Sequence, residues 1–247
     1  MSGHSKWATI KHKKGATDAK RAKVFAKLIR QVEVAAREGG PDPDTNPSLR
    51  TMYQKARDSS VPLDTIEKAI KRATGGLEGV NYEQITYEGY APGGVALLIE
   101  VLTDNRNRSG SDVRSTFTKR GGSMAEPGAG AWQFGRKGVL AVDGAADEDE
   151  LMMAAIDAGA EDIVQEGEVW RVTTDPHDLH KVRTAIEEGG FKVESGDLAM
   201  VAQNLVAIED VGSAKKVLEL IDHLEDLDDV QDVYGNFDIP DEILAQL

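Results

Sequence analysis

GVLAVDGAADEDELMMAAIDAGAEDIVQEGEVWRVTTDPHDLHKVRTAIEEGGFKVESG, residues 138–196, carries the clearest signal of fold class in this chain of 247 residues. Short apolar or alternating runs predict strands, and apolar residues at helical spacing predict helices. The order is strand 138–142, helix 147–159, strand 162–166, strand 168–174, helix 177–189 and strand 191–196. This βαββαβ succession is the ferredoxin-like arrangement.

The segments that flank this unit predict a second sheet. ITYEGYAPGGVALLIEVLT (85–103) indicates two strands joined by a Pro-Gly-Gly turn. Residues 104–122 indicate a loop and a helix, and residues 123–134 a glycine-rich loop followed by a short strand. Three elements then lack partners, namely a strand near 200–208, a helix at 212–224 and a strand at 230–234. We expect them to complete the sheet that starts at residue 85.

Residues 18–75 predict three amphipathic helices. Thr17 or Asp18 can cap the first, and Asn46 caps a second that has Pro47 at its first position. A third runs from 62–64 to Gly75-Gly76. Short amphipathic helices cannot bury their apolar stripes alone, so we expect one bundle. The expected inward residues are Val24, Phe25, Leu28, Ile29, Val32, Ala36, Leu49, Met52, Tyr53, Ala56, Ile66, Ala69, Ile70 and Ala73.

The expected fold class is α+β, with an N-terminal helical bundle plus two α/β domains, one ferredoxin-like (βαββαβ) and inserted into the other. The expected domains are a basic arm at 1–17, a helical bundle at 18–77, a discontinuous α/β domain at 78–134 plus 204–247, and the inserted ferredoxin-like domain at 135–203.

Charge is distributed unevenly along the chain, whose formal net charge is −14. Residues 1–75 hold sixteen Lys and Arg against eight Asp and Glu, whereas residues 141–247 hold six against twenty-eight. In the first thirty residues, nine basic side chains accompany a single acid, Asp18. Such segregation favours a polyanionic partner for the basic end. The acidic end is interpreted as a solvated surface.

The basic arm and the outer face of the first helix are the first candidate nucleic-acid contact. Lysines neutralise phosphates, and an indole can stack on an exposed base. The alternative is a disordered solubilising tail with its Trp tucked against the bundle. The candidate residues are Lys6, Trp7, Lys11, His12, Lys13, Lys14, Lys20, Arg21, Lys23, Lys27 and Arg30.

A second group of candidates lies where the chain enters the helix at 104–122. Arginines in a loop before a helix can hold phosphates together with backbone donors of the helix start. The alternative is ordinary capping and a solvated helix face. The candidates are Asn105, Arg106, Asn107 and Arg108, accompanied by Arg114, Lys119 and Arg120.

The third candidate is the loop MAEPGAGAW (124–132), with Gly128, Gly130 and Trp132. Its small residues make it flexible and allow a nucleic-acid backbone to approach closely. It lacks the GxxxxGK[ST] spacing of a nucleotide-triphosphate loop. The alternative is a plain connection between strands.

Enzyme chemistry finds little support. The chain has no cysteine, which excludes disulfides, thiolate metal sites and a cysteine nucleophile. GxSxG, GxGxxG and HExxH motifs are missing, and His177 with His180 lacks a third metal ligand. Neither a signal-peptide core nor a run of about 18 apolar residues occurs. We expect a cytoplasmic protein with no catalytic residues, metal, cofactor, small-molecule substrate or membrane association, and with its oligomeric state open.

The sequence resembles the YebC/PmpR family along its whole length. The motifs that carry the resemblance are GHSKWATIKHKK (3–14), DAKRAKVFAKLIR (18–30), YEGYAPGGVALLIE (87–100), LTDNRNRS (102–109) and GAWQF (130–134). Many relatives end the glycine loop in a Gly-Ser-Val-Ala-Trp-like run, whereas this chain has Gly128-Ala129-Gly130-Ala131-Trp132. The missing hydroxyl and branched side chain loosen the loop.

The resemblance implies three domains, a helical one and two α/β domains around a cavity. It also implies a nucleic-acid-binding, non-enzymatic regulator of gene expression. The conventional family description is a cytoplasmic probable transcriptional regulatory protein that binds DNA. The family also includes the mitochondrial translational activator of cytochrome c oxidase subunit I, and members act at the ribosome, where they relieve stalling at consecutive prolines.

Two readings of the partner therefore stay open. The predicted third helix has Lys68, Lys71 and Arg72 but few residues able to read base edges, which disfavours a duplex DNA regulator. Separate basic patches on an acidic protein suit folded RNA better. We expect an RNA- or ribosome-binding translational activator, with a DNA-binding transcriptional regulator as the alternative.

Overall fold

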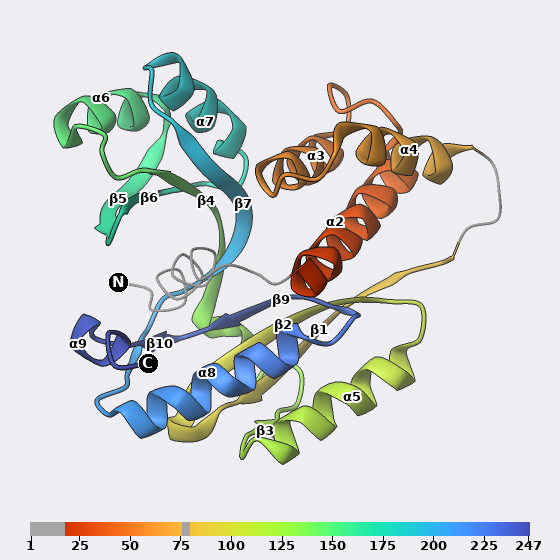
Figure 1. Ribbon diagram of the computed structural model, residues 1–247, viewed down its shortest axis with the longest axis vertical. Helices are drawn as coiled ribbons and strands as arrows, with labels where there is room; N and C mark the ends of the chain where they lie inside the picture. Colours follow the sequence, from red (N-terminus) through yellow and green to blue (C-terminus); the bar gives the residue numbers. More distant parts are fainter. Residues whose placement is uncertain (1–17, 76–79) are drawn as a thin grey trace. The chain divides into compact units, whose positions relative to one another are not determined.

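The computed structural model describes residues 18–75 and 80–247 (Figure 1). The basic arm at 1–17 lies outside the described residues. The described chain forms two compact units, one of residues 80–135 with 200–247 and the other of residues 18–75 with 136–199. Helices and mostly antiparallel sheets make an α+β fold, as the sequence predicts. The predicted domain boundaries stay a proposal.

Three helices form the bundle: α2 (Asp18–Gly39), α3 (Pro47–Asp58) and α4 (Leu63–Thr74). Leu28 and Val32 of α2, Leu49 of α3, and Ile66 and Ile70 of α4 are buried in one cluster, which confirms the predicted inward faces. Val24 is an exception, because its side chain is 43% exposed. It lies near the start of α2, outside the cluster that the three helices share.

Asn46 fixes the connection between α2 and α3. Its side-chain oxygen accepts from the backbone N–H of Leu49 at 3.0 Å, which caps α3 as the sequence predicts. Its amide nitrogen donates to the backbone oxygens of Ala35 at 2.8 Å and Gly40 at 2.9 Å. Asn46 is buried, so this one side chain satisfies polar groups at both helix ends.

The ferredoxin-like unit has the predicted order of elements, with two strands longer than expected. Its sheet has the order β5-β6-β4-β7, and α6 and α7 lie side by side over the shared core (Figure 1). Leu140 and Val172, paired in the register of β4 and β6, are both fully buried there. The elements are β4 (Phe134–Asp143), α6 (Glu148–Ala158), β5 (Ala160–Glu166), β6 (Val169–Thr174), α7 (Leu179–Glu188) and β7 (Val193–Ala202).

A charged contact joins the bundle to the ferredoxin-like sheet and helices within the second unit. Arg183 of α7 donates to both carboxylate oxygens of Asp58 at the end of α3, at 2.7 and 2.9 Å. Both side chains are about nine-tenths buried. Lys55 of α3 also pairs with Asp197 of β7. A bidentate guanidinium–carboxylate pair is a strongly directional contact, so it fixes the orientation of α7 on α3.

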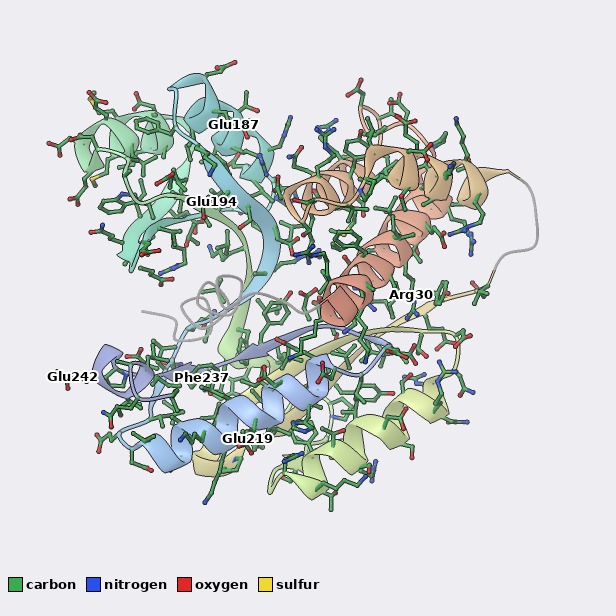
Figure 2. The ribbon with its side chains drawn as sticks, in the orientation of Figure 1. Arg30, Glu187, Glu194, Glu219, Phe237 and Glu242 are labelled. Atoms are coloured by element: carbon green, nitrogen blue, oxygen red, sulfur yellow. The ribbon has the colours of Figure 1, made fainter. Side chains whose placement is uncertain are left out.

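The first unit is built on the sheet β3-β1-β2-β9. Helices α5 and α8 pack side by side against one face of it (Figure 1). Phe237 of β10 is fully buried in the same cluster (Figure 2). The elements are β1 (Glu83–Tyr90), η1 (Pro92–Gly94), β2 (Ala96–Thr103), α5 (Arg106–Lys119), β3 (Ser123–Met124), η2 (Ala131–Gln133), β8 (Val206–Ala207), α8 (Val211–Glu225), β9 (Val230–Gly235), β10 (Phe237–Asp238) and α9 (Asp241–Leu244).

One predicted strand is wrong. The strand expected near 200–208 does not join the sheet of β1 and β2, whereas β9 does. Residues up to Ala202 belong to β7, the chain bends at Gln203-Asn204, and β8 then pairs in parallel with β10. Asn is unfavourable inside strands, and Asn204 separates the apolar residues of β7 from those of β8, which belong to different sheets.

Candidate nucleic-acid interface

Helix α2 carries five of the candidate basic side chains between Lys20 and Arg30. Lys20, Arg21 and Lys23 are exposed, and Lys27 and Arg30 are half-buried. Arg30 lies on α2 in Figure 2. The arm residues predicted to extend this surface lie outside the described residues, and they are Lys6, Trp7, Lys11, His12, Lys13 and Lys14.

Two of these cations lie close to Asp18, the first described residue of α2. Lys20 and Arg21 are both exposed, and neither forms an ion pair with an acidic side chain in residues 18–75 and 80–247. Their charges are therefore not matched by the described part of the bundle.

Helix α4 differs from α2 in how its cations are used. Lys68 pairs with Asp64 one turn earlier at 2.6 Å, and Arg72 pairs with Glu33 of α2. Of its three predicted basic residues, Lys71 is exposed and takes part in no ion pair among the described residues. The cations of α4 are therefore largely neutralised by the bundle itself.

At the start of α5, two candidate residues have structural partners. The side chain of Asn105 caps the helix by accepting from the backbone N–H of Arg108 at 3.1 Å. The guanidinium of Arg108 donates to Asp104 and to Asp229, each at 2.7 Å. These contacts, and above all the hydrogen bond to Asp229, raise the pKa of Arg108 above its ordinary value. Its charge is already matched by two carboxylates.

Asp229, just before β9, is the centre of this cluster. One carboxylate oxygen accepts from Arg108 and Ser109 at 2.7 Å and from Thr103 at 3.0 Å. Burial opposes ionisation of Asp229, but these hydrogen bonds outweigh burial and lower its pKa below the usual range. The cluster holds the end of β2, the start of α5 and the start of β9 together.

Along the first three turns of α5, a hollow of about 300 Å³ opens beside the helix. We call it the α5 hollow. It combines two guanidinium groups with amide, hydroxyl, phenol and thioether side chains. Burial raises the pKa of the phenol above its usual value. The lining residues are Tyr87 of β1, Met124 of β3, and Arg106, Asn107, Gly110, Ser111 and Arg114 of α5.

The glycine loop, residues 125–131, is not a loose connection. The carboxylate of Glu88 on β1 accepts from the backbone N–H groups of Gly128 and Gly130 at 2.6 Å and of Ala131 at 2.8 Å. Glu88 is 7% exposed. Burial opposes its charge, but the three donors lower its pKa below the usual value. The sequence suggested a loop open to a phosphate, whereas these donors already hold an internal anion.

Trp132 follows the glycine loop and faces outward. Its indole N–H donates to the backbone oxygen of Ala129 at 3.2 Å, and the phenol of Tyr90 donates to the same oxygen at 3.0 Å. The Trp132 side chain is 66% exposed. A large aromatic ring with its polar atom bonded locally offers a flat surface for stacking.

Sequence reasoning missed Glu88 and Asp229 as partners of the candidate residues. Glu88 is an acid in the second half of β1, between Tyr87 and Tyr90, and that position was the available signal. Asp229 is 121 positions from Arg108 and stands in an acidic run that was interpreted as solvated. Arg120 likewise contacts Glu219 and His223 of α8.

The histidine pair does not form a metal-binding group. His177 precedes α7 and its ring contacts Asp175 at 2.8 Å, while His180 lies in the first turn. Across residues 18–75 and 80–247, no three His, Asp or Glu side chains gather in a way that could hold a metal ion. None of the helices in those ranges is both long and apolar enough to span a membrane.

Comparisons with known proteins cover almost the whole chain. The TACO1/YebC protein N-terminal domain matches residues 5–76, and the TACO1/YebC second and third domain matches residues 82–237. A probable transcriptional regulatory protein of Halothermothrix orenii is 55% identical over 250 residues, covering 100% of this chain and 99% of that protein. One from Citrifermentans bemidjiense is 53% identical over 247 residues, covering 100% of both. The crystal structure of a conserved hypothetical protein from Aquifex aeolicus has a TM-score of 0.83 at 45% identity, covering 92% of this chain and 94% of that chain.

Proposed function

We propose that this chain, which belongs to the TACO1/YebC family (the YebC/PmpR family that its motifs resemble), is a cytoplasmic, non-enzymatic regulator of gene expression that binds RNA at the ribosome and relieves stalled translation. The family's proteins named above are called probable transcriptional regulatory proteins. Regulation of gene expression agrees with these names, and binding to RNA rather than DNA is what we add to them.

The observation that carries this proposal is the contrast between α2 and α4. Lys20 and Arg21 of α2 are exposed and form no ion pair with an acidic side chain in the part of the chain that the structure describes. On α4, the last helix of the bundle, Lys68 and Arg72 are engaged in ion pairs. A helix that reads the major groove needs free polar side chains on its outer face, so α4 is poorly suited to that role.

The distribution of charge also favours RNA. Basic residues lie in separate places, on α2 and on α5, and the rest of the chain is strongly acidic. A duplex presents a uniform rod of phosphates, which an acidic body would repel. Folded RNA presents phosphates at varied angles and unpaired bases that exposed aromatic side chains can stack on.

A DNA-binding transcriptional regulator is the second candidate. The printed name of the relatives favours it. Under that alternative, the basic face of α2 would follow a duplex backbone.

The test measures binding of the full chain to ribosomes and to random duplex DNA at several salt concentrations, beside a version without residues 1–17. A second variant, Lys20→Glu with Arg21→Glu, reverses two exposed charges on α2. We expect ribosome binding to fall at least tenfold in this variant, while its unfolding free energy changes by less than about 0.5 kcal/mol because both side chains are exposed.

The matched control is Lys215→Glu with Lys216→Glu, which reverses two exposed charges on α8. It should bind ribosomes like the unmodified chain. Sequence-selective duplex binding without ribosome binding would replace the proposal with the transcriptional alternative. Equal ribosome binding by both charge variants would exclude the α2 face as the contact.

A further inference from the structure

The α5 hollow contains cations that the fold does not neutralise. Arg106 and Arg114 both line it and both are exposed. In the described ranges, 18–75 and 80–247, neither of them forms an ion pair with an acidic side chain. Arg108, on the same helix between them, has two carboxylate partners. Arg108 therefore has a structural role, whereas the charges of Arg106 and Arg114 have no carboxylate partner in those ranges.

Helical geometry places these two guanidinium groups on one face. Residues 106, 110 and 114 are spaced by four, so they follow one stripe along α5. Gly110 occupies the middle of the stripe and supplies no side chain. The two arginines therefore flank an open floor, to which Asn107 and Ser111 contribute hydrogen-bonding groups.

Gly110 lowers the stability of α5, and its contact with Tyr87 in the hollow gives a reason for a glycine at this position. Glycine in a helix interior is unfavourable relative to alanine because it has more backbone freedom to lose. A Cβ at this position would lie 3.1 Å from the phenol oxygen of Tyr87. That phenol donates to the backbone oxygen of Arg106 at 3.3 Å, so it cannot withdraw without losing this bond. Gly110 thus keeps Tyr87 close to α5 and the hollow open.

We infer that the α5 hollow binds one unpaired nucleotide of an RNA strand, with its phosphate held by Arg106 and Arg114 and its base placed against Tyr87 and Met124. This inference rests on the proposed function, which it deepens by assigning a substrate class to one site.

The chemistry of the lining fits each part of a nucleotide. Arginine forks match phosphate oxygens in two-point contacts. A phenol ring and a thioether provide a flat polarisable surface for a base. Asn107 and Ser111 can accept or donate at the base edge or the ribose. A volume of about 300 Å³ accommodates one nucleotide rather than a duplex.

The experiment uses the full chain and a single-stranded RNA hexamer that carries one 4-thiouridine. Affinity is measured against salt, and the photo-crosslinked peptide is identified by mass spectrometry. The test variant is Arg106→Gln with Arg114→Gln. The matched control, Lys215→Gln with Lys216→Gln, removes the same charge from two exposed positions on α8, outside the hollow.

We expect crosslinks at Tyr87 or Met124 that disappear in the test variant and persist in the control. The slope of log affinity against log salt should fall by about 0.7 in the test variant, because the two arginines hold one phosphate and each neutralised phosphate on a single strand contributes about 0.7. Gly110→Leu, which fills the hollow and keeps both arginines, should reduce the crosslink as well. If Gly110→Leu fails to fold, the crosslinks and the salt slope of the Arg106→Gln, Arg114→Gln variant test the inference.

Two outcomes overturn the inference in distinguishable ways. RNA binding that is retained in the arginine variant, with crosslinks only in residues 6–30, removes the α5 hollow and leaves the proposed function intact. A hexamer and ribosomes that both fail to bind the unmodified chain remove the proposed function and this inference together.

Discussion

The glycine loop and the α5 hollow are both built from groups that bind anions. They meet β1 at neighbouring residues on opposite faces of the strand, since Tyr87 lines the hollow and Glu88 holds the loop. In the glycine loop, three backbone N–H groups converge on the carboxylate of Glu88, so the anion is part of the chain. In the α5 hollow, Arg106 and Arg114 converge on an open volume. The first site uses its anion to shape a loop. The second has its cations ready for an anion from elsewhere, and the following changes test that distinction.

The largest expected effect is on the glycine loop itself. Glu88→Ala should lower the free energy of unfolding by about 3 kcal/mol or more, because each N–H left without an acceptor costs about 1–3 kcal/mol. Urea unfolding gives this quantity. Glu83→Ala, at the exposed end of the same strand, should change it by less than about 0.5 kcal/mol. A loss for Glu88→Ala as small as the control's would mean that water replaces the carboxylate.

Asp229→Asn tests whether a neutralised arginine can be converted into a free one. The amide cannot match the charged hydrogen bonds to Arg108, Ser109 and Thr103, so we expect a loss of about 2 kcal/mol in unfolding free energy. Arg108 keeps only Asp104, and its release should steepen the salt dependence of RNA binding by up to about 0.7.

Asp228→Asn, one residue earlier and exposed, is the control for this change. It removes the same charge from a neighbouring exposed position. An unaltered salt slope in Asp229→Asn would mean that Arg108 does not contact RNA even when Asp229 no longer neutralises it. The position of Arg108 on α5, rather than its ion pairs, would then distinguish it from Arg106 and Arg114.

Acid should reveal the internal anion of the glycine loop. The pKa of Glu88 is lower in the folded chain than in the unfolded chain. Its contribution is therefore fully present above the unfolded value of about 4.3 and is lost as the pH falls through the lowered folded value. The difference in unfolding free energy between the native chain and Glu88→Gln should shrink over that range. A difference that stays constant from pH 7 to pH 3 would contradict this assignment.

Trp132→Ala should have the smallest effect on stability. The ring is mostly exposed, so the unfolding free energy should change by less than about 0.5 kcal/mol. Stacking on an aromatic side chain contributes about 1–3 kcal/mol per base, so single-stranded RNA affinity should fall by at least about fivefold. Unchanged RNA affinity would mean that the Trp132 ring does not stack on a base.

Local patterns were sufficient to predict most of the fold. The βαββαβ order follows from apolar periodicity, and the cap at Asn46 follows from Pro47 beside it. The strand expected near 200–208 was wrong because one apolar run is divided between β7 and β8, which belong to different sheets. Periodicity reports which residues are buried, and it does not report which sheet buries them.

The candidate site was less predictable than the fold. Arg106 and Arg108 look equivalent in the sequence, yet only Arg108 meets Asp229 from the far end of the chain. The same holds for Gly128, whose N–H is taken by Glu88, forty positions earlier. Pairings of this kind depend on strand register and helix placement, which a local pattern does not contain. The α5 hollow needs both, since β1, β3 and α5 all line it.

The chain leaves the first unit after residue 135 and returns to it at residue 200, and hydrogen bonds within the first unit join these two crossings. The backbone N–H of Gln203 donates to the backbone oxygen of Gln133 at 2.8 Å, and buried Asn236 bonds the side chain of Gln133 and the backbone of Ala96. The chain thus departs and returns through neighbouring positions of the first unit. A local insertion in a turn of residues 136–199 would therefore leave the hydrogen-bonded frame of the first unit intact. Deletion of the whole segment would not be neutral, because Arg183 holds the buried carboxylate of Asp58 on α3.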